Sequence, residues 1–282
     1  MKKQIRITLL ALAALVTLGL GGWFLIGGLR PPTPTEPPPA ESESPPPQEA
    51  APPKPSQTAA VDTQRLAAFV EKLSHVPEYQ AFFARFRVLY PAIYNAALRE
   101  ALARNIDKRK NPADFFLAES VGTLRQNRGL DGAMASGAAL DRLFDAHFKV
   151  MRALAATDAS LCVDFLNGAP AERFVAFAGD HRALMADEAM AGLNAIDDGA
   201  QQKIARKPPN DQDFDDLEKL LREKGLNKAA IDLLLDGKTP NPPLSDAQMC
   251  QNGLAYLAAL KNLPAQPRMR LYALALEVMS GR

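Results

Sequence analysis

The sequence predicts an all-α protein with one N-terminal transmembrane helix, a disordered proline-rich spacer and a multi-helix globular domain. An uncharged apolar run extends from Ile7 to Leu29, long enough to cross a bilayer as a helix. Twelve of the 27 residues in 31–57 are proline. After residue 57, alanine and leucine dominate, strand-favouring β-branched residues are sparse, and apolar residues recur at helical spacing. The chain therefore divides into residues 1–30, 31–57 and 58–282.

Residues 1–30 are interpreted as a short cytoplasmic stub and a transmembrane signal anchor. At ~1.5 Å per residue, a helix over the apolar run would be roughly 34 Å long, enough to span the hydrocarbon core of a bilayer. Three basic residues precede the run, whereas only Arg30 follows it closely. The positive-inside rule then places the N-terminus in the cytoplasm and the domain on the outer side of the membrane.

A cleaved signal peptide is the alternative interpretation of the same residues. Gly19-Leu20-Gly21 resembles a small-x-small cleavage site. The apolar run nevertheless continues to Ile26 and beyond, which is longer than the apolar core of a typical signal peptide. The length of the run therefore favours an uncleaved single-pass anchor that holds the chain in the membrane through residues 7–29.

The spacer, residues 31–57, has almost no side chains to bury and cannot offset the entropy cost of ordering itself. Because proline fixes φ near the polyproline value, we expect an extended segment with a reach of roughly 80 Å at ~3.1 Å per residue. A docking tract for a proline-recognising partner is the alternative. Anchor and spacer together are similar in layout to Gram-negative envelope proteins that reach across the periplasm. We therefore expect a bacterial inner-membrane protein with a periplasmic domain.

The domain, residues 58–282, carries no net charge. Of the 33 basic residues in the chain five precede residue 58, and of the 32 acidic residues four do, which leaves 28 of each. Such a balance offers no basic surface for the phosphates of a nucleic acid, so no nucleic-acid partner is expected. The length is ample for one sizeable core.

Helices follow one another along the domain. The first carries the i, i+3, i+4, i+7 pattern of Leu66, Phe69, Val70 and Leu73. A similar pattern runs from Tyr79 to Ala97 across Pro91, which either kinks one helix or opens a second. Further helices are expected at 113–127, 138–157, 159–167, 171–205, 212–224, 228–236, 246–262 and 268–280.

Short polar residues and glycines mark the expected helix ends. The long helix 171–205 has a candidate break at Gly179 and Asp180. Ser, Asn and Asp side chains cap helix N-termini, and glycine often follows a helix C-terminus. The candidate N-caps are Asp158, Asn227 and Ser245, and the candidate stops are Gly168, Gly225 and Gly237.

Residues 211–237 are predicted to form a helical hairpin, since proline pairs bracket two short amphipathic segments there. The structural interpretation is a hairpin that packs on the body of the domain. The functional interpretation is an arm that contacts a protein partner. The candidate partner-binding residues are Phe214, Leu217, Leu221 and Leu234.

The two cysteines, Cys162 and Cys250, are predicted to form a disulfide, because an even number of cysteines outside the cytoplasm is normally oxidised. In the chain-entropy model, closing a loop of this length stabilises the fold by about 4 kcal/mol. Two free buried thiols are the alternative. A redox site is not expected, since the sequence has no C-x-x-C pair.

No metal or cofactor site is expected. No two histidines have the spacing of metal ligands, and His147 falls on an apolar helix face typical of a satisfied core histidine. The triplet Asp211, Asp213 and Asp215 resembles the start of an EF-hand loop. The loop pattern then fails, because Asp216 replaces the glycine at its sixth position. The triplet is better explained as acidic residues at a helix N-terminus.

One enzymatic resemblance involves Glu119. Glu119-Ser120 followed by Gly132-Ala133-Met134 resembles the lytic transglycosylase pattern over about sixteen residues. The chain departs from that pattern at 135–137, and its Tyr94-Asn95-Ala96 element precedes the glutamate where the family has it after. The resemblance implies that Glu119 acts as general acid and base on a glycosidic bond.

The sequence therefore favours a binding or scaffold protein of the bacterial envelope, held by its anchor and acting on an envelope protein partner. The alternative is a cell-wall-active glycosidic enzyme of lytic transglycosylase type centred on Glu119. The two hypotheses differ in where the fold places that residue, since an active site requires a cleft.

Overall fold

The computed structural model describes residues 57–166 and 172–280. These residues form twelve α-helices and one 3-10 turn and contain no strand, which confirms the all-α prediction for the domain. The predicted anchor, the spacer up to residue 56 and Gly168 lie outside the described residues. Within 57–166 and 172–280, no helix is both long and apolar enough to cross a membrane.

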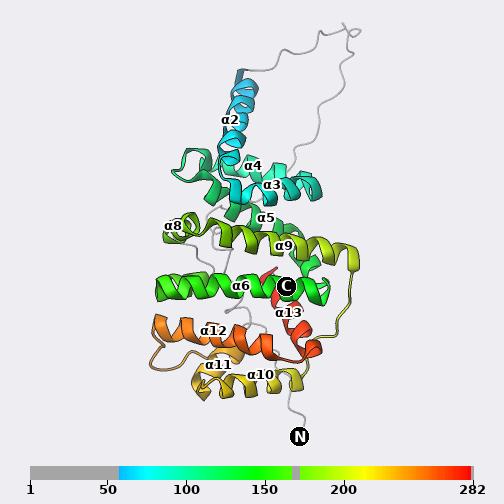
Figure 1. Cartoon of the computed structure of the whole chain (residues 1–282), viewed down its shortest axis with the longest axis vertical. Helices are drawn as coiled ribbons and strands as arrows, with labels where there is room; N and C mark the ends of the chain where they lie inside the picture. Colours follow the sequence, from blue (N-terminus) through cyan, green and yellow to red (C-terminus); the bar gives the residue numbers. More distant parts are fainter. Residues whose placement is uncertain (1–56, 167–171, 281–282) are drawn as a thin grey trace, which may run out of the picture.

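The helices stack along the long axis of the molecule (Figure 1). Helices α2, α3 and α4 lie at one end, and α10 and α11 lie at the other, beyond α12. Helices α5, α6 and α9 form the centre, where α9 packs against both α5 and α6. Helix α13 packs on α5, and α7 packs on α12 and α6.

The N-terminal third is built by α2 (Gln57–Ser74), α3 (Pro77–Leu89), α4 (Pro91–Ala103), the 3-10 turn η1 (Ile106–Lys108) and α5 (Pro112–Ala133). Pro91 opens a second helix rather than kinking one, because α3 ends at Leu89 and proline suits the first turn of α4. The buried ring of Phe116 contacts the rings of Phe69 and Tyr94 edge to face in this part of the core.

The middle of the domain is built by α6 (Gly137–Thr157), α7 (Ala159–Leu166), α8 (Glu172–Asp180) and α9 (Arg182–Gln202). The expected helix 171–205 breaks after Asp180, close to the predicted point. Asp158 caps α7 as expected, because its carboxylate accepts hydrogen bonds from the backbone N–H groups of Ser160 and Leu161.

The C-terminal part contains α10 (Asp211–Glu223), α11 (Lys228–Asp236), α12 (Asp246–Asn262) and α13 (Ala265–Met279). Asn227 and Ser245 cap α11 and α12 as predicted. Gly225 and Gly237 follow α10 and α11 with φ of 85° and 66°, a backbone conformation that favours glycine.

Three details of the fold differ from the sequence prediction. Helix α5 continues six residues past the expected end at residue 127, because Gly129 and Gly132 pack inside the helical stack. The turn η1 was not expected; it forms where Asp107 accepts hydrogen bonds from Arg65 of α2. Helix α13 begins three residues before the expected residue 268. The first two differences depend on tertiary contacts rather than on local sequence.

The two cysteines predicted to form a disulfide lie at bonding distance from each other. The Sγ atoms of Cys162 in α7 and Cys250 in α12 lie 2.03 Å apart, and both residues are buried. The cross-link joins two helices that are far apart in the sequence, with a separation of 88 residues.

Candidate ligand cavity

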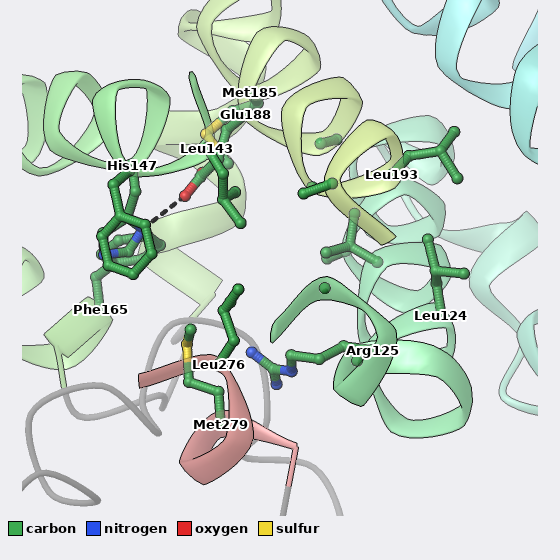
Figure 2. Close-up of a pocket in the computed structure, with 18 of the residues that line it drawn as sticks. Leu124, Arg125, Leu143, His147, Phe165, Met185, Glu188, Leu193, Leu276 and Met279 are labelled. Carbon is green, nitrogen blue, oxygen red and sulfur yellow. Dashed lines mark hydrogen bonds and ion pairs between the residues drawn. The ribbon is translucent and has the colours of Figure 1, made fainter. Parts of the chain in front are cut away.

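A cavity of about 140 Å³ lies in the centre of the domain, between α5, α6 and α9. Helices α7, α8, α12 and α13 complete its walls. The close-up in Figure 2 shows side chains from these separate helices converging on the space between them. The walls are mainly apolar; prominent lining residues are Leu117, Leu124, Leu143, Phe165, Met185 and Leu193.

A small residue on α9 leaves room for the cavity. Gly192 faces it from α9, and a Cβ added there would meet only Leu143, at 3.9 Å, an ordinary van der Waals distance. Gly199, two turns further along α9, is different, since an added Cβ would lie 1.8 Å from the backbone oxygen of Asp131. Helix α9 therefore approaches α5 closely at Gly199 and stands away from its neighbours at Gly192.

The disulfide holds two walls of the cavity together. Cys162 lies one turn before Phe165 of α7, and Cys250 lies one turn before Gly253 of α12. Phe165 and Gly253 both line the cavity. The cross-link therefore fixes the distance between α7 and α12 where they border it.

A histidine and a glutamate meet at one side of the cavity. Nδ1 of His147 in α6 lies 2.7 Å from Oε1 of Glu188 in α9 (Figure 2). An ionised carboxylate only accepts hydrogen bonds, so His147 holds its proton on Nδ1 in this contact. Its ring also stacks on Phe165, with the centroids 5.2 Å apart. The expectation of a satisfied histidine on this apolar face fits the contacts, although the ring also faces the cavity.

Arg125 supplies a polar group to the side of the cavity opposite His147 and Glu188. It lines the cavity from α5, and Figure 2 shows its guanidinium directed toward Leu276 of α13, away from the dashed line that joins His147 and Glu188. Within the described ranges, Arg125 has neither a hydrogen bond nor an ion pair. Burial lowers the pKa of its guanidinium, and the negative charge of Glu188 acts in the opposite direction. Arginine nevertheless stays protonated in proteins, so the cavity contains a cation.

The first turn of α5 presents a second charged side chain to the same cavity, and the hydrogen bonds of this side chain are satisfied. Asp114 is 2% exposed and accepts hydrogen bonds from Tyr79 at 2.7 Å and from two nitrogens of Arg182 at 3.0 Å. Burial, together with the hydrogen bond to this carboxylate, raises the pKa of the Tyr79 hydroxyl. Asp114 is a structural ion-pair site that ties α3, α5 and α9 together.

Glu119 lies on α5 but does not line the cavity. Its carboxylate pairs with Arg104 at the end of α4, at 2.5 Å, and its side chain is 14% exposed. Burial raises the pKa of Glu119, and the positive charge of Arg104 opposes that shift. The residue is thus neither in the cavity nor on an open face.

The four hairpin residues proposed for a partner are mostly inside the domain. Leu217, Leu221 and Leu234 are fully buried where α10 and α11 pack on each other and on α12. Phe214 is partly buried. The aspartate triplet begins α10, where Asp213 forms a capping box with Asn210 and pairs with Arg270. Among the described residues, no cluster of three His, Cys, Asp or Glu side chains could hold a metal ion.

Comparisons with protein-family models, with curated proteins and with solved structures find no match for this chain. The candidate site therefore depends on its own geometry. Sequence reasoning missed both Arg125 and Glu188. A signal was present for Arg125, since it falls on the stripe that Leu117, Val121 and Leu124 form on α5. A charged residue on a buried stripe indicates either a hidden partner or a ligand.

Proposed function

We propose that this chain is a membrane-tethered binding protein of the bacterial envelope whose helical domain holds a small, mainly apolar ligand between α5, α6 and α9. The single observation that carries the proposal is the cavity itself. Ligand sites are typically apolar spaces with a few convergent polar groups, and this space has apolar walls plus Arg125, Glu188 and His147. Protein interiors are otherwise packed with few voids larger than a water molecule.

The size of the cavity limits the ligand. An engineered apolar cavity of about 150 Å³ accepts benzene, so about 140 Å³ suits a group of about six carbon atoms. The predicted anchor and spacer are the basis for the membrane location in the proposal. They would hold the domain on the periplasmic side of the inner membrane, where a reach of roughly 80 Å would let it meet an envelope protein partner.

The glycosidic enzyme centred on Glu119 remains the alternative. Its support is the raised pKa of that carboxyl, which a general acid requires. Against it, Glu119 is paired with Arg104 and borders no part of the cavity. The binding role is therefore the better supported of the two.

Filling the cavity tests the proposal. Gly192→Leu adds a side chain where the space is open, and Ala229→Leu on the exposed face of α11 is the matched control. The probe is hexanamide, a neutral six-carbon amide, added to the full-length chain in lipid nanodiscs and followed by saturation-transfer NMR. We expect transfer to hexanamide with the native chain and the control, and loss of transfer with Gly192→Leu. No transfer with the native chain, or equal transfer with Gly192→Leu, would overturn the proposal.

A further inference from the structure

The guanidinium of Arg125 differs from the other buried or half-buried arginines of the domain. Arg182 pairs with Asp114, Arg270 with Asp213, and Arg206 with two backbone carbonyl oxygens. These arginines use their planar donor groups on acceptors supplied by the fold. Arg125 has no such acceptor among the described residues, although it faces an apolar space in which a bare cation is costly.

The one nearby carboxylate is already engaged. Glu188 is 8% exposed and holds His147 at 2.7 Å, which uses one of its oxygens. Its charge reaches Arg125 only through space, without a hydrogen bond between the two side chains. The other carboxylate at the cavity, Asp114, is paired with Arg182 near the start of α5. The five donors of Arg125 therefore stay available to a molecule inside the cavity.

We infer that the ligand of this cavity is an organic carboxylate of about six carbon atoms in all, with its anionic group on Arg125 and its apolar part against the walls. The inference rests on the proposed function and adds the chemical class of the ligand. A guanidinium binds a carboxylate through two parallel hydrogen bonds, and such charge-assisted bonds are about twice as strong as neutral ones. The apolar part lies between Leu124, Leu193 and Phe165, where the cavity offers few other polar contacts.

Hexanoate and hexanamide separate the inference from the proposed function, because they have the same shape and differ in charge. Binding of each to the full-length chain in nanodiscs is measured by isothermal titration calorimetry, with empty nanodiscs as the blank. Arg125→Gln removes the cation. Arg152→Gln on the exposed surface of α6 removes the same charge outside the cavity and is the matched control.

We expect the native chain to bind hexanoate at least tenfold more tightly than hexanamide. Arg125→Gln should abolish that preference, whereas Arg152→Gln should keep it. Equal binding of both compounds by the native chain, or a preference that survives Arg125→Gln, would overturn the carboxylate while the cavity function stands. Failure of both compounds to bind the native chain would overturn the proposed function, and the inference with it.

Discussion

Helix α5 presents two opposite charges to one cavity, and only one of these charges has its partner among the described residues. Near the start of the helix, Asp114 accepts hydrogen bonds from Tyr79 and Arg182. Eleven residues later, Arg125 faces the same cavity without a partner among the described residues. A satisfied buried charge holds helices together, whereas an unsatisfied one costs stability unless something else binds it. The comparison therefore separates a structural ion-pair site from the proposed ligand site on a single helix.

The largest expected change in stability comes from the disulfide between α7 and α12, rather than from either of the two charges on α5. Replacing Cys162 and Cys250 together by alanine should lower the free energy of unfolding by about 2–5 kcal/mol, because the unfolded chain regains the freedom of a long loop. Urea denaturation of the full-length chain, followed by circular dichroism, measures this. An unchanged midpoint in oxidising buffer would show that the bridge does not hold the walls.

Removing the partner of Asp114 should lower the free energy of unfolding more than replacing Arg125 does. Arg182→Met leaves the carboxylate of Asp114 buried without its cation, and breaking such a pair costs about 3 kcal/mol or more. The same denaturation experiment measures the loss. A change below about 1 kcal/mol, the usual size for an exposed ion pair, would contradict the assignment of Asp114 as a structural site.

The two glycines of α9 extend the comparison to packing. Gly199→Ala forces a Cβ against the backbone oxygen of Asp131 and should destabilise the domain by about 1–3 kcal/mol. Gly192→Ala meets only Leu143, at an ordinary van der Waals distance, and should stabilise the domain by about 0.5–1 kcal/mol through helix propensity. If both variants were destabilised to the same extent, the space beside Gly192 would not be open in solution.

Replacing Arg125, the charge on α5 without a partner among the described residues, should have an effect about as small as that of Gly192→Ala. Arg125→Met removes an unpaired cation and keeps a long apolar stem, so it should stabilise the ligand-free chain by about 1 kcal/mol. Arg152→Met on the surface of α6 is the control and should stay within about 0.5 kcal/mol of native. The same substitution would thus act in opposite directions at Arg125 and Arg182. Destabilisation by Arg125→Met comparable to that by Arg182→Met would mean that Arg125 has a structural partner.

Much of the helical framework could be predicted because its signals are local. Pro91 separates α3 from α4 through its missing N–H and fixed φ, and Asn227 and Ser245 cap the helices that follow them. The disulfide was predictable from the even cysteine count, together with the expectation of an extracytoplasmic domain. The hairpin was predicted as a unit, but its leucines proved to be buried by α12, which no pattern within 211–237 reveals.

The cavity could not be predicted in the same way. Its walls come from helices as far apart in the sequence as α5 and α13, and the space depends on how closely these helices approach one another. Gly192 and Gly199 have the same local sequence signal and opposite surroundings. Arg125 could be noticed on an apolar stripe, yet whether it had a partner depended on the positions of Glu188 and His147 in other helices.

The most direct test of the account is a structure of the full-length chain determined with hexanoate. The account predicts the carboxylate oxygens of hexanoate within about 3.2 Å of the guanidinium nitrogens of Arg125, with the alkyl chain between α5 and α9 and the contact of His147 with Glu188 retained. A structure in which Arg125 bonds to Glu188 while hexanoate lies elsewhere, or in which side chains fill the cavity, would contradict it.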